Sequence, residues 1–470
     1  MPRPILSQPT FIVFPAMRPL SASRLNDFLG CPHQAALWLA GIKPEEEADA
    51  TLRLIRDKGF EHEAAVLARL EKLHGRAERI PSEGSLADRA RLTREAIERG
   101  ATLIYQGALT KEAWLGYPDF LIRTSSASTA GFAPEDAKLS RKAKGEYVLQ
   151  LGIYAELLEA LFGVPMHSGT VHVAAGDPET FDLRRTRYIL KRLMRDFERF
   201  IADEARVTNP RPCAACAQCD YKPRCENEWR NADSPFFVAG LSSAQVVKLA
   251  AAGIHTLSSL AALLPATRIE GMGAETVAKL SAQARLQLDA RKTGKHAFEL
   301  LPCSRGRGFA MLPAPDDGDL FFDMEGDPLA GDGLEYLFGV YGRLAGAKES
   351  EFRPIWAHSP AEEKASFEGA MRLFVDQVSR NPGAHIYHYA AYEPTALKHL
   401  AMRYATMEAE LDQLLRERRF VDLYRVVVQS LRASTETYSL KDLEVLYGQA
   451  GAGTGFSGRF RPGFNVRWSG

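Results

Sequence analysis

Four of the six cysteines crowd into one short segment, and this constrains the fold more than any other feature of the sequence. They are Cys213, Cys216, Cys219 and Cys225. Thiolates at such spacing bind Zn²⁺ or an iron–sulfur cluster. The segment is polar and contains prolines, so unligated core cysteines are a weak explanation. With only Cys31 and Cys303 besides, no disulfide scaffold is expected, which favours a reducing, cytoplasmic location.

The length and charge balance narrow the possibilities further. A chain of 470 residues predicts about three domains. Its 59 basic and 59 acidic residues cancel, so any nucleic-acid surface must be local. No apolar run approaches the roughly 20 residues of a membrane helix. The first residues do not resemble a secretion signal. We therefore expect no membrane partner.

The order of helical and strand-like patterns predicts an α/β protein of three domains. Residues 20–235 run from helices through a group of strands to helix, strand and helix. Residues 236–300 are Leu- and Ala-rich and predict a small all-α domain. Residues 310–450 return to strand-then-helix order. The Gly-rich residues 451–470 have little apolar periodicity and are expected to be disordered.

Two aspartates and a lysine in the first domain form a pattern suited to metal-dependent hydrolysis. Asp119 ends a Gly-Tyr-Pro-Asp segment at one strand, and Asp136 and Lys138 lie on the next strand. Residues i and i+2 of a strand point to the same face, so Asp136 and Lys138 are expected side by side. Mg²⁺ prefers carboxylate oxygens. A neighbouring ammonium can orient the attacking water and offset negative charge in the transition state.

Three more side chains complete this constellation. His62, on a predicted helix, can offer a neutral imidazole nitrogen to a metal, which suits Mn²⁺ better than Mg²⁺. Gln150 and Tyr154 are four residues apart and therefore share one helix face. Each piece alone is common at protein surfaces or in cores. The hypothesis of metal-dependent hydrolysis depends on their order along the chain, on a predicted helix, two strands and a second helix.

In this order the motifs resemble the RecB-like members of the PD-(D/E)XK nucleases, over roughly residues 20–230. The resemblance implies a restriction-endonuclease-like fold that uses Mg²⁺ or Mn²⁺. The implied catalytic and metal-binding set is His62, Asp119, Asp136 and Lys138. Gln150 and Tyr154 would contact DNA or the surroundings of the metal. The residue between Asp136 and Lys138 is Ala, where the family often has a β-branched residue.

The same resemblance bears on the cysteines. RecB-like relatives with a 4Fe–4S cluster place one cysteine before the nuclease core and three after it. That layout implies Cys31, Cys216, Cys219 and Cys225 as cluster ligands and leaves Cys213 spare. The alternative is a local zinc site made by the four cysteines of residues 213–225. Either site would join the two ends of the domain and couple metal loss to unfolding.

The all-α segment resembles a helix-hairpin-helix module. Gly271 and Gly273 lie between two predicted helices, where glycine lets backbone N–H groups approach a phosphate. Residues 241–296 hold seven basic and three acidic residues, including Lys279 and Arg285 on the second helix. A local basic surface of this kind would bind DNA without reading its sequence. The alternative is a plain helical linker with a tight turn.

The third domain opens with an apolar strand that ends in Asp323 and Glu325, which share a face by the same i,i+2 argument. With Glu393 and Asp422, this pattern looks like an RNase H-like exonuclease fold over about residues 317–447. The resemblance implies acidic ligands around two metals. Glu393 stands where Asp is usual, and the final acidic helix is replaced by the Gly-rich tail. We therefore expect a shortened domain that supports the protein or holds substrate.

Together these features predict a divalent-metal-dependent DNA nuclease of repair or recombination, an exonuclease acting on ends or single strands. The alternative is a non-catalytic DNA-binding subunit with degenerate nuclease folds, working beside a helicase. An RNA-processing enzyme is a third possibility. No Gly-x-x-x-x-Gly-Lys-Ser/Thr loop occurs, so the sequence shows no motor of its own.

Overall fold

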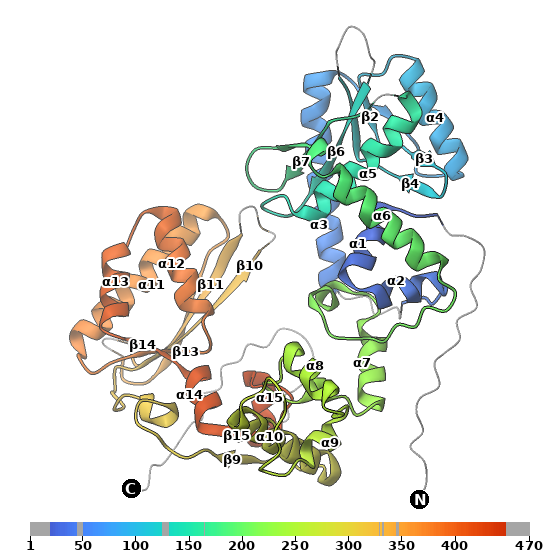
Figure 1. Ribbon diagram of the computed structural model, residues 1–470. Coiled ribbons are helices and arrows are strands. Elements are labelled where there is room, and N and C mark those ends of the chain that lie inside the picture. The colour runs from blue at the N-terminus through green and yellow to red at the C-terminus, as the bar shows by residue number, and fades with distance from the viewer. Residues whose placement is uncertain are drawn as a thin grey trace, which may run out of the picture. The chain divides into compact units, whose positions relative to one another are not determined.

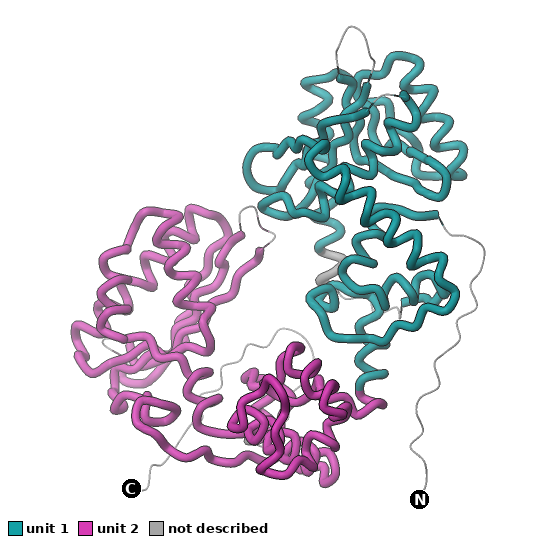
Figure 2. The backbone as a smooth tube through the Cα atoms, in the orientation of Figure 1, with its two compact units in different colours: residues 1–229 teal, residues 230–470 magenta. Residues whose placement is uncertain are grey.

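The computed structural model describes residues 19–44, 50–124, 131–163, 165–328, 330, 333–344 and 347–447. The chain divides into two compact units, residues 1–229 and 230–470 (Figure 2). The division falls inside helix α7 (Lys222–Asn231). The predicted tail, residues 451–470, lies outside the described residues. Among the helices of the described segments, none combines the length and apolar character that crossing a bilayer requires.

The first unit is built on a six-stranded sheet of order β1-β2-β5-β6-β7-β8 (Figure 1). Its strands are β1 (Glu78–Arg79), β2 (Leu103–Tyr105), β5 (Phe120–Thr124), β6 (Gly131–Lys138), β7 (Ser168–Val173) and β8 (Glu179–Asp182). Strands β5 and β6 are antiparallel. Strands β6 and β7 are parallel and are joined by helix α5 (Gly145–Phe162), because a parallel pair needs a crossover connection.

Helices α3 (Ala50–His74) and α5 cover opposite faces of this sheet. Alternation along β5 explains the arrangement, since successive side chains of a strand point to opposite faces. Phe120 and Ile122 belong to the apolar cluster of α3, and Leu121 belongs to that of α5. The other elements are α1 (Ala22–Gly30), α2 (Pro32–Leu39), α4 (Leu86–Glu98), α6 (Arg187–Ala202) and a hairpin of β3 (Leu109–Lys111) and β4 (Trp114–Gly116).

The second unit begins with three helices that share a core of their own. They are α8 (Ser243–Ala251), α9 (Leu257–Ala261) and α10 (Ala274–Thr293). Leu249, Leu260 and Leu280 meet in this core. The chain continues into β9 (Phe298–Leu300), which pairs with β15 (Leu431–Ala433) near the end of the described chain.

A five-stranded sheet of order β12-β11-β10-β13-β14 forms the rest of this unit. Its strands are β10 (Leu320–Asp327), β11 (Leu334–Gly342), β12 (Glu351–Trp356), β13 (Ile386–His388) and β14 (Phe420–Asp422). The central strand β10 is antiparallel to β11 and parallel to β13. Helices α11 (Pro360–Arg380), α12 (Tyr392–Tyr404) and α13 (Glu408–Arg416) share one core with the sheet, in which Phe322 and Met324 are buried.

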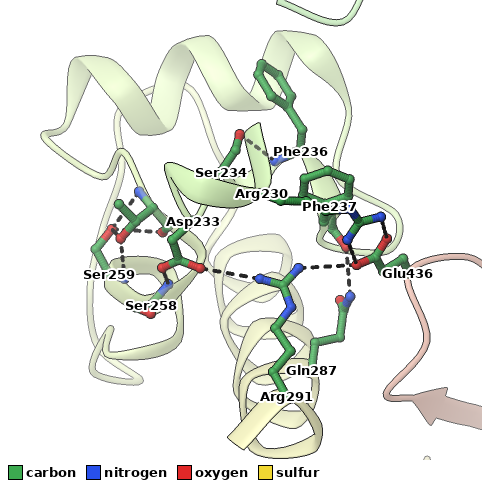
Figure 3. A network of polar contacts seen from close by, with 11 residues as sticks. Arg230, Asp233, Ser234, Phe236, Phe237, Ser258, Ser259, Gln287, Arg291 and Glu436 are labelled. Carbon is green, nitrogen blue, oxygen red and sulfur yellow. Dashed lines mark hydrogen bonds and ion pairs between the residues drawn. The ribbon is translucent and has the colours of Figure 1, made fainter. Parts of the chain in front are cut away.

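A polar network inside the second unit links its helical segment to the loop that follows β15 (Figure 3). The Arg291 guanidinium on α10 lies between Asp233, at 3.4 Å, and Glu436, at 3.3 Å. Arg230 pairs with the same Glu436 carboxylate through two hydrogen bonds of 2.9 and 3.0 Å. Both guanidinium groups also lie over the Phe237 ring. These contacts fix the helical segment against its own unit.

Candidate functional site

In the first unit the structure brings Asp119, Asp136 and Lys138 into direct contact. The backbone N–H of Asp119 donates to Oδ1 of Asp136 at 3.2 Å. The backbone N–H of Ala137 donates in turn to Oδ2 of Asp119 at 2.9 Å. Lys138 Nζ lies 3.0 Å from Oδ2 of Asp136, as the i,i+2 argument predicts. The carboxylate of each aspartate therefore accepts a hydrogen bond from a main-chain N–H group that belongs to the other aspartate or to its neighbour in sequence.

Burial makes this pair of carboxylates electrostatically costly. It raises the pKa of Asp119 well above its ordinary range, and the charge of Asp136 raises it further. Burial also raises the pKa of Asp136, which is only 1% exposed, while Lys138 opposes the shift. For Lys138, burial works to lower the pKa, but the two carboxylates raise it above its ordinary value. A cation beside these oxygens would relieve the cost, and carboxylate oxygens are the ligands that Mg²⁺ prefers.

The structure adds Glu63 to this group, a residue that the sequence argument passed over in favour of His62. The Glu63 charge raises the pKa of both Asp119 and Asp136, and its carboxylate accepts a hydrogen bond from the Gln106 side chain. The imidazole of His62 lies with Nε2 2.9 Å from the main-chain oxygen of His172. That nitrogen must carry the proton, so a metal would reach His62 only through Nδ1.

Gln150 and Tyr154 support the segment that carries Asp119. The Gln150 amide donates to the Tyr154 hydroxyl at 2.7 Å, and that hydroxyl donates to the main-chain oxygen of Tyr117 at 3.2 Å. The Tyr154 ring packs so closely on Gly116 that a Cβ there would lie 2.6 Å from it. The structure thus gives the Gln/Tyr pair a positioning role two residues from Asp119.

The cysteines of the first unit converge although Cys31 is far from the others in sequence. Cys31, Cys216, Cys219 and Cys225 line one small open pocket, and Cys213 is absent from its lining. The Cys213 Sγ atom lies 3.8 Å from Sγ of Cys216 on the exposed side. Burial, followed by the charges of neighbouring thiols, raises the pKa of Cys225 to about 12. Such a thiol ionises readily only when a metal binds it.

In the helical segment, the four residues that are predicted to bind DNA have different surroundings. Gly271 has a φ of +72°, and its carbonyl accepts a hydrogen bond from Lys248 Nζ at 2.6 Å. Gly273 is the N-cap of α10. The Arg285 guanidinium donates to two carbonyl groups at the end of α9, so it caps a helix in this structure. Lys279 is exposed on α10.

In the second unit three acidic side chains meet near the carboxyl end of β10. Asp323 is exposed on the face of the sheet, yet partial desolvation of its carboxyl group and the charges of Glu393 and Glu325 raise its pKa to about 6. Glu393, at the start of α12, is 3% exposed, and its Oε2 lies 3.5 Å from Nδ1 of the equally buried His388. Neither of those two atoms has a hydrogen-bond partner within the described structure. The pocket of Glu393 is therefore polar and incompletely satisfied, as expected where a cation would bind.

Asp422 lies at the end of β14, directly beside His388 in the strand register. Its Oδ1 accepts hydrogen bonds from the backbone N–H groups of Ala390, at 3.0 Å, and Arg425, at 3.2 Å. In this way it caps helix α14 (Leu423–Ser430) and holds the turn that leads to Glu393. The structure shows this positioning contact for Asp422, and its predicted metal-binding role stays a prediction.

The region that contains the five-stranded sheet and these acidic residues is similar to a known family. Residues 320–469 match the family model of the RNase H superfamily. The C-terminal region is an RNase H-like domain. This superfamily is generally a fold of metal-dependent nucleases acting on nucleic acid, so the predicted RNase H-like fold of this region is confirmed, while the predicted bounds 310–450 stay a prediction. No curated protein matches the chain. The RecB-like assignment of residues 20–235 and the helix-hairpin-helix assignment stay predictions.

Within the described segments, no three or more His, Cys, Asp or Glu side chains already stand in an arrangement that could hold a metal ion. This applies to the three acidic residues around Asp119, to those around the RNase H-like Asp323, and to the cysteines. Ion binding at any of them requires side chains to turn from the positions seen here. Glu63, for example, would have to leave Gln106.

Proposed function

We propose that this protein is a divalent-metal-dependent nuclease that hydrolyses phosphodiester bonds, with DNA as its substrate. The hydrolytic site is Asp119, Asp136 and Lys138 of the first unit. The observation that carries the proposal is the buried carboxylate pair with an ammonium 3.0 Å from Asp136. The RNase H-like domain supports nucleic acid as the substrate class.

When bound, Mg²⁺ or Mn²⁺ supplies an electrophile for the phosphoryl oxygen and an activated water. Asp119 and Asp136 would hold it, and Glu63, whose charge acts on both aspartates, is the candidate for a third carboxylate. Lys138 keeps its proton, because its pKa is raised, so it donates hydrogen bonds and stabilises negative charge rather than accepting a proton. Gln150 and Tyr154 keep the Asp119 segment in place.

The test is cleavage of end-labelled single- and double-stranded DNA and matched RNA by the full chain with Mg²⁺ or Mn²⁺. Asp136→Asn and Lys138→Met should abolish cleavage. Lys142→Met removes an exposed lysine four residues away and should not. Cleavage by the Asp323→Asn variant measures how much of the activity depends on the RNase H-like domain. If Asp136→Asn and Lys138→Met both cleave at the wild-type rate, the proposed hydrolytic site is wrong.

A non-catalytic role is the second candidate, because no ready-made metal site is present in the described segments. In that case the chain would be a DNA-binding subunit acting beside a helicase in repair or recombination. It predicts salt-sensitive DNA binding that Asp136→Asn and Lys138→Met leave intact. It also predicts that the wild-type chain shows no cleavage with either metal.

We further propose that Cys31, Cys216, Cys219 and Cys225 hold a 4Fe–4S cluster. The support is the pocket that these four residues line, while the Cys213 thiol lies at its exposed side, 3.8 Å from Sγ of Cys216. Protein purified without oxygen should absorb visible light and contain iron. Cys31→Ser should lose both properties, and Cys213→Ser should keep them. Colourless protein containing zinc would favour the local zinc site instead.

A further inference from the structure

One exposed thiol lies beside the cysteine pocket and has no role in the proposed cluster. Cys213 is exposed and does not line the pocket, whereas Cys216 lines it and is half-buried. The Sγ atoms of these two residues are 3.8 Å apart. They form a Cys-x-x-Cys pair, a spacing that is typical of thiols which are oxidised and reduced together. Cys213 therefore needs an explanation of its own.

The main chain holds the two thiols on the same side of a short turn. Cys213 is the N-cap of the 3₁₀ helix η2 (Ala214–Gln218), and Cys216 is the third residue of this helix. In such a helix, side chains three residues apart lie one above the other. The N–H of Cys216 donates to the carbonyl of Cys213 at 3.1 Å, and the N–H of Cys213 donates to Sγ of Cys216 at 3.4 Å. The approach of the two thiols is thus set by main-chain hydrogen bonds.

The turn that carries Cys213 is also fixed against the end of helix α1. The Cys213 thiol donates to the carbonyl of Gly30 at 3.6 Å. A Cβ on Gly30 would lie 3.2 Å from the Cβ of Ala215, so the turn packs closely on this helix end. Cys213 is therefore held beside the pocket, in a place where a small reagent in water can reach its sulfur atom.

We propose that Cys213 and Cys216 form a redox-active pair whose disulfide withdraws Cys216 from the metal pocket. The two sulfur atoms have to approach from 3.8 Å to the length of an S–S bond, about 2 Å, which rotation of the two side chains can provide. An accessible thiol beside a second thiol that can complete a disulfide is the usual arrangement of redox-sensitive cysteines. The withdrawal of Cys216 rests on the proposed cluster, whereas the disulfide itself does not.

The oxidant is a small soluble disulfide, of which oxidised glutathione is an example. The Cys213 thiolate attacks one sulfur of this disulfide, which forms a mixed disulfide and releases one small thiolate. The Cys216 thiolate then attacks Sγ of Cys213, the mixed disulfide bond breaks, and the second small thiolate leaves. Each chain thiol loses one proton, and the released thiolates take up these protons. The chain is oxidised by two electrons and the small disulfide is reduced by two, so an excess of small thiol reverses the reaction.

The experiment follows the tryptic peptide 207–224, which contains Cys213, Cys216 and Cys219. The full-length chain, with metal removed by a chelator, is incubated with oxidised glutathione, its free thiols are alkylated, and the peptide is analysed by mass spectrometry without reduction. The Cys213–Cys216 disulfide should exceed the Cys216–Cys219 disulfide by about tenfold, because access decides which thiols exchange. The same chain unfolded in urea is the control. Both pairs have the same spacing in sequence, so the two disulfides should then form in similar amounts.

Cys31 is the rival partner of Cys213, since burial raises the pKa of the Cys31 thiol and the charge of Cys213 adds to this effect. A Cys31–Cys213 disulfide would join two tryptic peptides and would overturn the proposal. Equal shares of the two disulfides of peptide 207–224 with and without urea would also overturn it. So would free thiols at Cys213 and Cys216 under conditions in which the exposed Cys303 forms a mixed disulfide. Cys216→Ser should stop at a mixed disulfide on Cys213, and Cys303→Ser should change nothing in this peptide.

The chain purified without oxygen, with its metal bound, separates this proposal from that of the cluster. Because Cys216 would then be bound to metal, the reaction should stop at the mixed disulfide on Cys213. If the metal protects Cys213 itself, while chelation permits the Cys213–Cys216 disulfide, the redox pair is supported and the cluster ligand set is wrong. A Cys213–Cys216 disulfide that forms at the same rate with and without metal would overturn the withdrawal of Cys216.

Discussion

The charge of Lys138 depends on its two carboxylate neighbours, which hold its proton despite its burial. A charged lysine beside the proposed metal site would have two opposing effects. It repels the metal, and it stabilises the negative charge that develops on the phosphoryl group. The two effects can be separated by measuring metal binding and turnover on the same variant.

We predict that Lys138→Met lowers kcat by about 10² to 10⁴-fold, the range typical of a lost proton-transfer or charge-stabilising group. Binding of Mg²⁺ or Mn²⁺, measured by calorimetry, should be retained or become tighter, because a nearby positive charge is removed. Weaker metal binding with normal turnover would contradict this assignment. Lys142→Met serves as the control in both measurements.

Asp323 should make stability depend on pH when metal is absent. Its pKa is about 6, above the ordinary value of 3.8, because of partial desolvation and the charges of Glu393 and Glu325. Between these two values the folded chain holds a proton that the unfolded chain has released, so stability falls as pH rises through this window. We predict that Asp323→Asn melts higher than the wild type at pH 7.5 in EDTA, but not at pH 3.5. A difference in melting temperature that is the same at both pH values would argue against this origin.

At the scale of elements, the contact of β4 with α5 depends on a missing side chain. A Cβ on Gly116 would lie 2.6 Å from the Tyr154 ring and 2.9 Å from Leu157. We predict that Gly116→Ala destabilises the protein by about 1–3 kcal/mol in chemical unfolding, the usual cost of overpacking. It should also lower activity by shifting Tyr154. Gly145→Ala, with open space around it at the start of α5, should be neutral or slightly stabilising.

The elements themselves were largely readable from periodicity. The apolar spacing of residues 144–162 predicts a helix, and α5 spans Gly145–Phe162. The apolar residues of 114–122 predict one strand, whereas the structure has two strands, β4 and β5, separated by Tyr117, Pro118 and Asp119. Proline has no N–H to donate to a ladder, which explains the break. Helix α4 was passed over, although the Ser85 hydroxyl caps its first turn as such a sequence indicates.

Only part of the candidate site can be predicted from the sequence, because some of its contacts join residues that are far apart along the chain. The neighbours Asp136 and Lys138 followed from strand periodicity alone. The influence of Glu63 on the two aspartates depends on how α3 is rotated against the sheet, which the weak helical pattern around this residue does not fix. The position of Asp422 beside His388 depends on the pairing of β13 with β14. Pairing between distant strands is set by the whole fold, and no local pattern reports it.

At the scale of the whole molecule, the second unit should unfold as one body from its first helices onward. The Gln283 amide on α10 donates to the main-chain oxygen of Ala433 at 2.7 Å, and its oxygen accepts a hydrogen bond from the Tyr438 hydroxyl at 3.0 Å. We predict that Gln283→Leu, which leaves these groups unpaired, costs about 1–3 kcal/mol. Hydrogen exchange should then speed up together in α10 and in residues 431–438. Faster exchange in α10 alone would contradict the coupling.

For the first unit, we predict that a change at the cysteine pocket affects hydrogen exchange in this unit alone. It joins Cys31 to residues 216–225, so if the proposed cluster is bound there, its removal should loosen both ends of residues 20–229. Chelation, or Cys31→Ser, should speed hydrogen exchange in α1, α2 and α7. Exchange in β10 to β14 should stay the same. Equal changes in both units would show that the metal does not act through this pocket.

Strand β10 holds the acids Asp323 and Glu325 of the RNase H-like domain on one face, and this limits how the strand can change in evolution. Its period of two residues keeps Phe321, Asp323 and Glu325 on the exposed side. Insertion or deletion of a single residue between Phe321 and Asp323 would transfer both acids to the side that α11 and α12 cover. Variants of this protein should therefore differ in length in the connections around β10, while its residues 321–325 keep a constant number.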